Sequence, residues 1–185
     1  MKLTGISISK NRRLCKQVKA LYRSAFPKEE LLPWPLMRLL TLREGASIRG
    51  WMDGDTFCGF TYSATVNGFC FVMFFAVEPG LRGQGYGSAI LEALKAEAPT
   101  VPVILNIEPI LDTAPNLQER KNRLAFYQKN GFFDTGFMIR EVGGVFTVMA
   151  TCPKIDPEQY ARLFRYISFG FWHVTVKPAD QWNLS

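Results

Sequence analysis

Histidine and cysteine are scarce in this chain of 185 residues, and their scarcity argues against several kinds of site. The one histidine, His173, would have to supply alone the base of a chymotrypsin-like triad or the histidine ligand of a metal hydrolase. The four cysteines, Cys15, Cys58, Cys70 and Cys152, include no CxxC pair and fit neither a zinc site nor a dense disulfide framework. We therefore expect reduced thiols, no bound metal and a cytoplasmic protein.

Long hydrophobic runs are also lacking. The longest one, residues 69–77, has nine residues. That is about half of the ~18 residues that a membrane-spanning helix requires. The first thirteen residues, MKLTGISISKNRR, contain neither an apolar segment nor a small-residue cleavage site, so a signal peptide is not expected. We expect no membrane partner.

No long run of basic residues occurs, although the formal net charge is +6. The lysines and arginines are scattered and no RNA-binding motif is present, so we expect no nucleic-acid partner. A nucleic-acid-binding module stays an alternative, and its signature would be a steep salt dependence of binding to generic RNA or DNA. A modest positive field attracts an anionic cofactor equally well.

The sequence does contain apolar stretches with the periods of strands and helices. Turn signals at Gly54 and at Asn67-Gly68 predict three antiparallel strands in a row. The order is strand, two helices, three strands, helix, strand, helix and two strands, which indicates an α+β domain with one strand–helix–strand crossover. The expected strands span residues 2–9, 46–51, 57–66, 69–77, 101–107, 132–140 and 145–152, and the expected helices about 11–26, 33–40, 87–98 and 116–130.

Residues 153–185 lie beyond this pattern. Asp156 and Pro157 open an expected helix. Its apolar residues share one face and are followed by a dense group of aromatic residues that would be awkward in water. These aromatic residues pack on the core, form a subunit interface or make a wall of an acceptor pocket. The apolar face consists of Tyr160, Leu163, Phe164 and Ile167, and the aromatic group consists of Phe169, Phe171, Trp172 and Trp182.

A glycine-rich stretch between an apolar strand and an amphipathic helix carries the main functional signal. It reads V-E-P-G-L-R-G-Q-G-Y-G-S over residues 77–88. Glycines at the start of a helix leave backbone N–H groups that an anion can reach, because no Cβ atoms stand in the way. The positive end of the helix and Arg82 add to the attraction. In physical terms this is a pyrophosphate-binding loop, and a tight turn without a ligand is the alternative.

A second motif makes the interpretation specific. The run V-x-P-x-x-R-G-x-G-x-G-S resembles the acetyl-CoA signature of the GNAT acetyltransferase superfamily, and A-F-Y-Q-K-N-G-F at residues 125–132 resembles its F-Y-x-x-x-G-F. The resemblance covers residues 1–152, which we interpret as a GNAT domain. Residues 153–185 are then an extension that packs on the same domain or at a subunit interface. The implied fold is α+β, with a mixed, mostly antiparallel sheet of six to seven strands flanked by helices and a C-terminal helical and aromatic extension.

The resemblance implies an acetyl-CoA-dependent N-acetyltransferase. Its acceptor would be a primary amine of a small molecule, which attacks the thioester directly in a ternary complex. A protein or peptide acceptor is one alternative, and a non-catalytic acyl-CoA-binding sensor is another. Family members are frequently dimers, and the aromatic extension is compatible with a homodimer.

Site residues follow from the same resemblance. Tyr127 is expected to face the CoA sulfur as general acid, with a buried aromatic as the alternative. Glu108 is expected to be the general base, directly or through water, or else a solvated charge at a strand end. A backbone N–H on the strand before the glycine loop, that of Val77 or a neighbour, is expected to bind the oxyanion. In the family this strand splays from the next one, which leaves room for the thioester and exposes such groups. The expected cofactor-binding residues are Ala76, Val77, Arg82, Gly83, Gln84, Gly85, Tyr86, Gly87 and Ser88.

The chain departs from the family pattern at Arg120, where many members have an asparagine seven residues before the tyrosine. Asn122 nearby is therefore not counted as a cofactor contact. Glu29 and Glu30 attract a cationic acceptor or are surface charges, and as neighbours they cannot face one pocket equally well. Three further aromatic residues line the acceptor pocket or belong to the core: Trp34, Trp51 and Tyr62.

Overall fold

The computed structural model describes residues 3–66, 68–97, 99–141 and 143–183. Lys2, Asn67 and Ala98, which the sequence places in a strand, a turn and a helix, lie outside these residues.

The predicted order of helices and strands is confirmed. The strands are β1 (Thr4–Ser7), β2 (Ala46–Asp53), β3 (Thr56–Val66), β4 (Phe69–Val77), β5 (Val103–Ile107), β6 (Phe133–Glu141), β7 (Gly144–Ala150) and β8 (Thr175–Pro178). The α-helices are α1 (Arg12–Ala25), α2 (Trp34–Leu40), α3 (Tyr86–Glu97), α4 (Leu117–Lys129) and α5 (Pro157–Ile167), and a 3-10 helix, η2 (Lys28–Glu30), precedes α2.

The strands form one sheet in the order β1-β2-β3-β4-β5-β7-β6-β8. All neighbouring strands are antiparallel except β4 and β5, which are parallel and are connected through α3. The sheet has eight strands instead of the predicted six to seven, because β8 pairs with β6. This strand has four residues and ends in a proline, so its sequence is too short to show an alternating pattern.

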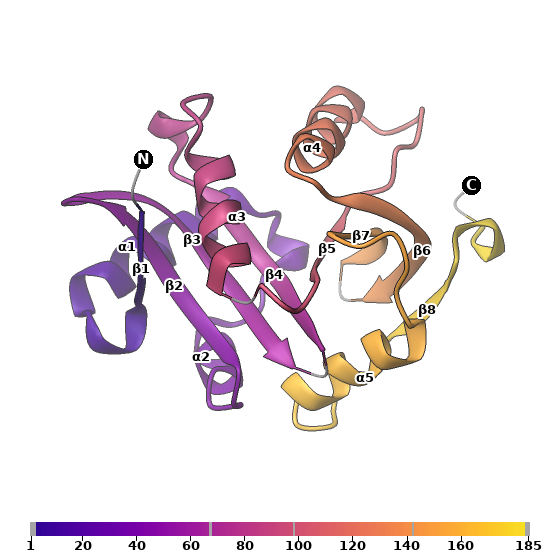
Figure 1. Ribbon diagram of the computed structural model, residues 1–185, viewed down its shortest axis with the longest axis horizontal. Coiled ribbons are helices and arrows are strands. Elements are labelled where there is room, and N and C mark those ends of the chain that lie inside the picture. Colours follow the sequence, from indigo (N-terminus) through magenta and orange to yellow (C-terminus); the bar gives the residue numbers. More distant parts are fainter. Residues whose placement is uncertain (1–2, 67, 98, 142, 184–185) are drawn as a thin grey trace.

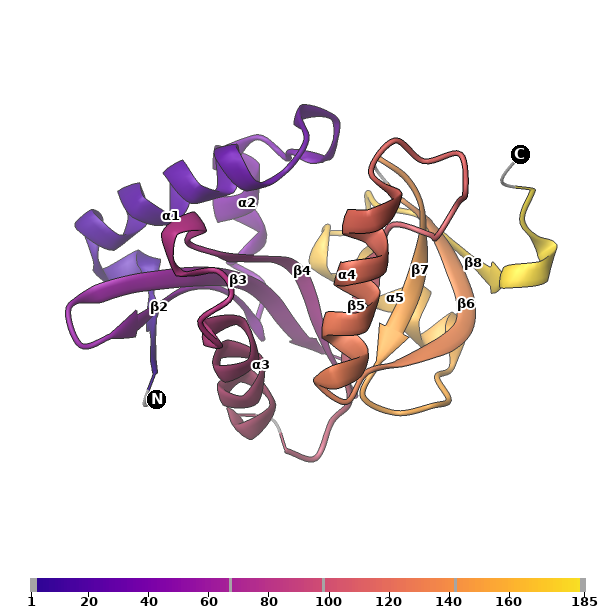
Figure 2. The same ribbon diagram turned by 90° about the horizontal axis from the view of Figure 1, so that it is seen from above.

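Helices cover both faces of the sheet (Figures 1 and 2). Side chains alternate between the two faces along a strand, so residues next to each other in β5 belong to different clusters. Leu105 packs with α3 and α4, whereas Ile104 packs with α5. Figure 2 shows α1 on the opposite side of the strands from α3. In β3, Tyr62 and Ala64 point to the same face and belong to the α1 and α5 clusters. The face that carries α1 and α2 is therefore also the face that carries α5.

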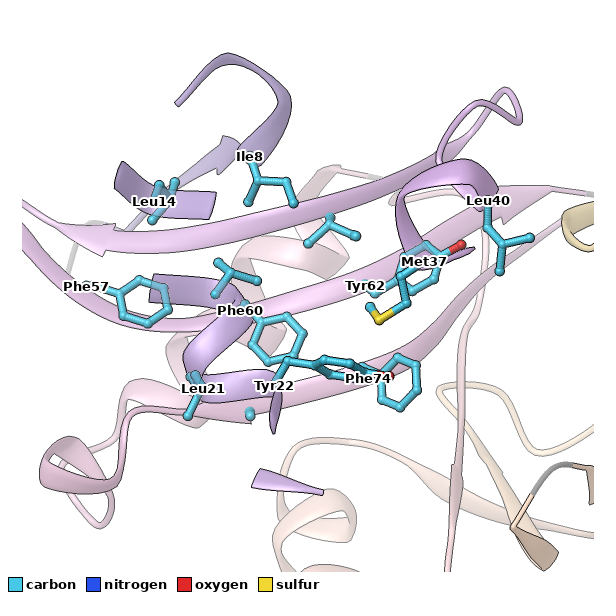
Figure 3. Packing of buried hydrophobic residues seen from close by; sticks show 13 residues of the cluster. Ile8, Leu14, Leu21, Tyr22, Met37, Leu40, Phe57, Phe60, Tyr62 and Phe74 are labelled. Atoms are coloured by element: carbon cyan, nitrogen blue, oxygen red, sulfur yellow. The ribbon is translucent and has the colours of Figure 1, made fainter. Parts of the chain in front are cut away.

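Aromatic packing fixes α1 against the sheet (Figure 3). The Asn11 side chain accepts a hydrogen bond from the Leu14 N–H at 3.0 Å and caps the start of α1. The Tyr22 ring meets Phe74 edge-on, with 5.0 Å between ring centroids. Its hydroxyl donates to the Leu32 carbonyl at 3.1 Å and accepts from the Leu32 N–H at 2.7 Å. These bonds hold the segment that carries η2 next to α1.

The C-terminal extension lies on the same sheet as the rest of the chain. Tyr160, Leu163, Phe164 and Ile167 of α5 are fully buried and pack against β4, β5, β6 and β7. Burying a side chain of this size stabilises a fold by about 1.5–3 kcal/mol. The four side chains therefore make a substantial contribution to the stability of the domain. Within the described part of the chain, no helix is long and apolar enough to cross a membrane.

Candidate active site

A break in the sheet creates the site. Strands β4 and β5 pair only over Cys70–Val72 and Val103–Leu105, and beyond these residues they are no longer paired. A cavity of about 1310 Å³ occupies the opening. Its lining includes the second half of β4, the end of β5, the glycine loop and one side of α4. The splay between these two strands is the feature that the family resemblance implies.

The glycine loop borders this cavity at the start of α3. Gly83 and Gly85 have φ angles of +77° and +86°, which favour glycine, and a Cβ atom on either would meet nothing within 4 Å. The Ala89 N–H bonds to the Gly85 carbonyl at 3.1 Å as the α-helical pattern begins. The preceding N–H groups lie in the first turn, where a helix provides no backbone acceptor. An anion can therefore contact these groups at the positive end of α3.

Most of the predicted cofactor-binding residues line the cavity. They are Ala76, Val77, Arg82, Gly83, Gly85, Gly87 and Ser88. The side chains of Gln84 and Tyr86 bond within the protein instead. The Gln84 amide donates to the Gly80 carbonyl at 3.0 Å, and the Tyr86 hydroxyl donates to Asp53 at 3.1 Å. These two bonds stabilise the loop, and neither Gln84 nor Tyr86 lines the cavity.

Hydrogen bonding in β4 indicates which backbone N–H near the end of this strand is directed into the opening. The Glu78 N–H donates to the Cys58 carbonyl of the neighbouring chain segment at 2.9 Å. Successive N–H groups of a strand point to opposite edges, so the Ala76 N–H also faces β3. The Val77 N–H faces the other edge, where β5 has moved away. Val77 therefore has its N–H directed into the opening.

Tyr127 lines the cavity from α4. Its ring packs between Phe126 and Phe132, at centroid distances of 5.2 and 5.5 Å. Burial raises the pKa of Tyr127 to about 12, against a smaller lowering by the charge of Arg123. The hydroxyl therefore keeps its proton throughout the physiological pH range.

Glu108 also lines the cavity, but it is tied into an ion cluster. It forms ion pairs with Arg120, at 3.0 Å, and with Arg123, and it accepts a hydrogen bond from Asn116 at 3.2 Å. Burial acts to raise the pKa of Glu108. The hydrogen bonds from Arg123 and Asn116 and the two arginine charges outweigh this effect, so the pKa lies below its usual value. Arg120, at the departure from the family pattern, also donates to the Pro109 carbonyl at 2.8 Å and so fixes the loop before α4.

Three further carboxyl groups line the cavity, from Glu30 of η2, Glu119 of α4 and Glu141 of β6. Burial raises the pKa of Glu30, and the negative charge of Glu108 adds to this rise. Burial raises the pKa of Glu141 to about 7, although a hydrogen bond from Asn106 lowers it. Glu29 is exposed and does not line the cavity, so of the two adjacent glutamates only Glu30 faces it.

Three aromatic residues considered for the acceptor pocket, Trp34, Trp51 and Tyr62, do not line the cavity, whereas Trp172 of the C-terminal extension, also considered for that pocket, does. Trp51 and Tyr62, two of the candidates, are 1% exposed and belong to the core. Trp34, the third, packs against the cluster under α1. Phe26, Phe146 and Trp172 line the cavity instead. Among the other lining residues, Asn106 could have been noticed in the sequence, because it is the one polar residue in an otherwise apolar strand. Nothing in the sequence marks Glu141 as a site residue.

Residues 46–133 match the family model of the acetyltransferase (GNAT) domain. A protein from Bacteroides thetaiotaomicron, described as an acetyltransferase of the GNAT family, is 25% identical, with a TM-score of 0.70 over 92% of this chain and 99% of that one. This chain contains a GNAT acetyltransferase domain. It is therefore an acyltransferase, and both sequence motifs lie at or within the bounds of the matched region.

Two other solved structures share the GNAT fold at lower identity. The ribosomal-protein-S18-alanine N-acetyltransferase of Escherichia coli is 19% identical, with a TM-score of 0.59 over 85% of this chain and 97% of that one. An aminoglycoside 6'-N-acetyltransferase complexed with coenzyme A is 16% identical, with a TM-score of 0.62 over 84% of this chain and 100% of that one. No protein with a curated function matches the sequence significantly.

Proposed function

We propose that this GNAT protein transfers the acetyl group of acetyl-CoA to a primary amine of a small molecule, by direct attack in a ternary complex. One observation carries the proposal. The opening between β4 and β5 joins an anion-binding glycine loop to carboxyl groups that attract a cation, with Tyr127 along the same cavity. Such an arrangement suits an anionic acyl donor at one end and an ammonium group at the other.

The chain's residues fit coenzyme A. The open space at Gly83 and Gly85 lets a pyrophosphate approach the N–H groups at the start of α3, and Arg82 lines the same part of the cavity. The fold relatives include one whose structure contains coenzyme A. When bound, acetyl-CoA would supply the activated thioester carbonyl, and the loop would hold its phosphates.

Val77 and Tyr127 would act on the thioester. The Val77 N–H, directed into the opening, would stabilise the oxyanion that forms when the amine attacks. Tyr127 would donate a hydrogen bond to the leaving sulfur as the carbon–sulfur bond breaks. Because its pKa of about 12 exceeds the ~8.5 of an ordinary thiol, full proton transfer to the sulfur requires that the attacking nitrogen returns a proton to the phenolate.

Glu108 stays a prediction as the base. Its ion pairs with Arg120 and Arg123 and its lowered pKa leave it ionised at neutral pH. Such a carboxylate attracts a cationic amine, but it is a weak acceptor of the amine's proton.

A covered acceptor end favours a small amine over a peptide. At Gly143, in the turn between β6 and β7, a Cβ atom would lie 2.9 Å from Cγ of Glu30. The turn and η2 are therefore in contact across the end of the cavity, whereas an extended peptide requires an open groove. Transfer to a protein or peptide amine is the second candidate. A homodimer and a cytoplasmic location remain predictions.

The test is thiol release from acetyl-CoA in the presence of tyramine, spermidine, tobramycin and a peptide with a free N-terminus. We expect release with at least one small amine. Tyr127→Phe should lower kcat and leave the Kd for acetyl-CoA unchanged, with Tyr166→Phe as a control on another helix. Release with the peptide alone would favour the second candidate. Tight binding of acetyl-CoA with no release would favour a sensor, and absence of binding would refute the proposal.

A further inference from the structure

We propose that Glu141 accepts the proton of the acceptor ammonium, and that Tyr160 of the C-terminal helix positions it through Asn106. This inference rests on the proposed function and assigns the proton acceptor within it. It also gives the extension after residue 152 a role in the reaction, through one residue of α5 that is held against the site.

A chain of hydrogen bonds connects the three residues. Tyr160 Oη donates to Asn106 Oδ1 at 2.9 Å, and Asn106 Nδ2 donates to Glu141 Oε1 at 2.7 Å. An ionised carboxylate only accepts hydrogen bonds, so Asn106 must turn its NH2 group toward Glu141. Tyr160 holds the amide in this orientation because its hydroxyl donates to the opposite atom. Tyr160 is 0% exposed and packs against Phe71 and Phe164, so its position is fixed.

The chain of bonds lies on the opposite face of the sheet from Tyr127. Asn106 alternates with Leu105 and Ile107, which pack with α3 and α4, so its side chain points to the α5 face. Tyr127 belongs to the α3 and α4 cluster. Both Glu141 and Tyr127 nevertheless line the one cavity, because the strands are separated there. An acceptor entering from the α1 and α5 face would meet Glu141 while Tyr127 faces the donor from the other side.

The surroundings of Glu141 suit a base at neutral pH. The facing groups are the carboxyl of Glu30 from η2 and the Tyr160 hydroxyl from α5. Burial raises the pKa of Glu141 to about 7, the charge of Glu30 adds to this, and Asn106 opposes it. The arginines of α4, Arg120 and Arg123, are instead ion-paired with Glu108. A base with a pKa near the working pH transfers protons more effectively than one that stays ionised.

Glu141 and Tyr127 together account for every proton that is transferred in the reaction. Glu141 takes one proton from the ammonium, and the free nitrogen forms a bond to the thioester carbon. After the carbon–sulfur bond breaks, the sulfur has the proton of Tyr127, and Tyr127 has regained one from the nitrogen. The products are the amide and the free thiol, and Glu141 releases its proton to water.

Carbon-13 NMR of side-chain carboxyl groups tests the assignment without any acceptor. In the wild-type protein we expect one resonance that titrates near pH 7, and we expect Glu141→Gln to remove it. Tyr160→Phe keeps the ring but frees Asn106, so the midpoint of that resonance should move to higher pH. Glu158→Gln and Tyr166→Phe on the same helix are matched controls and should change neither feature. A wild-type spectrum without a carboxyl titrating above pH 6 would overturn the inference.

The rate gives the second readout, with thiol release from acetyl-CoA and the best amine of the panel. Removing a general base costs about 10²–10⁴-fold, so Glu141→Gln should lower kcat/KM by about 100-fold or more. Tyr160→Phe should shift the rising limb of the pH–rate profile to higher pH, which loss of packing alone would not do. If wild-type protein releases thiol and Glu141→Gln does so equally well with the same profile, the inference fails and the proposed function stands. If wild-type protein neither binds acetyl-CoA nor releases thiol, both fail.

Discussion

Gly85→Glu should abolish tight binding of acetyl-CoA while the protein stays folded. Gly85 has a φ of +86°, and a Cβ atom there would meet nothing within 4 Å. The left-handed backbone costs a non-glycine residue about 1–2 kcal/mol. That is a fraction of the ~5–15 kcal/mol that stabilises an ordinary domain, so we expect a lower Tm but a folded protein.

The loss of affinity comes from charge and from occupied space. The new side chain would stand in the open space before α3, where the phosphates are proposed to bind. Two like charges about 4 Å apart repel by about 4 kcal/mol at an effective dielectric constant of ~20, and solvent exposure at the loop reduces this to roughly half. A loss of about 2–4 kcal/mol corresponds to a Kd higher by roughly 30- to 700-fold.

Isothermal titration calorimetry with acetyl-CoA measures this effect. Gly136→Glu is the matched control, because Gly136 also has a positive φ, of +74°, and open space around its Cβ position, but it lies in β6 away from the loop. We expect this control to bind as wild type does. A folded Gly85→Glu protein that binds acetyl-CoA within about threefold of wild type would show that the loop is only a turn, and would contradict the proposed cofactor site.

Three further predictions concern stability. Leu163→Ala removes a side chain that is 0% exposed, so urea denaturation should show a loss of about 2–5 kcal/mol, whereas Leu42→Ala, at a residue that is 74% exposed, should have little effect. Glu108 has a lowered pKa in the folded protein, so its stabilisation is present above its ordinary pKa of 4.5 and is lost as the pH falls. Glu108→Gln should therefore lower the Tm at pH 7 but not at pH 3, and an equal difference at both would refute the ion-pair explanation. Glu141 has a raised pKa, so the stability that its proton provides is present below pH 4.5 and is lost as the pH rises through about 7. Glu141→Gln should raise the Tm at pH 8 and leave it unchanged at pH 4, and a lower Tm at pH 8 would contradict burial of the charge.

Much of the fold could be predicted from local patterns. The three antiparallel strands β2, β3 and β4 follow from alternating apolar residues and glycine turns, and the start of α1 follows from its Asn11 cap. The strand β8 could not be predicted, because four residues carry too little periodicity and because its partner, β6, is distant in the sequence. The glycine loop needed no tertiary information, since its anion-binding capacity comes from backbone geometry over a few neighbouring residues.

The sequence by itself thus determined the family, the order of elements and the loop at residues 77–88. Only the tertiary structure decided which side chains meet in the cavity. Asn106 bonds to Glu141 across 35 positions of the chain and to Tyr160 across 54. Glu108, for which the family resemblance implies the role of base, forms ion pairs with two arginines of α4. Such contacts depend on strand register and helix packing, and both the pKa of a carboxyl group and its role follow from these neighbours, which no local pattern reveals.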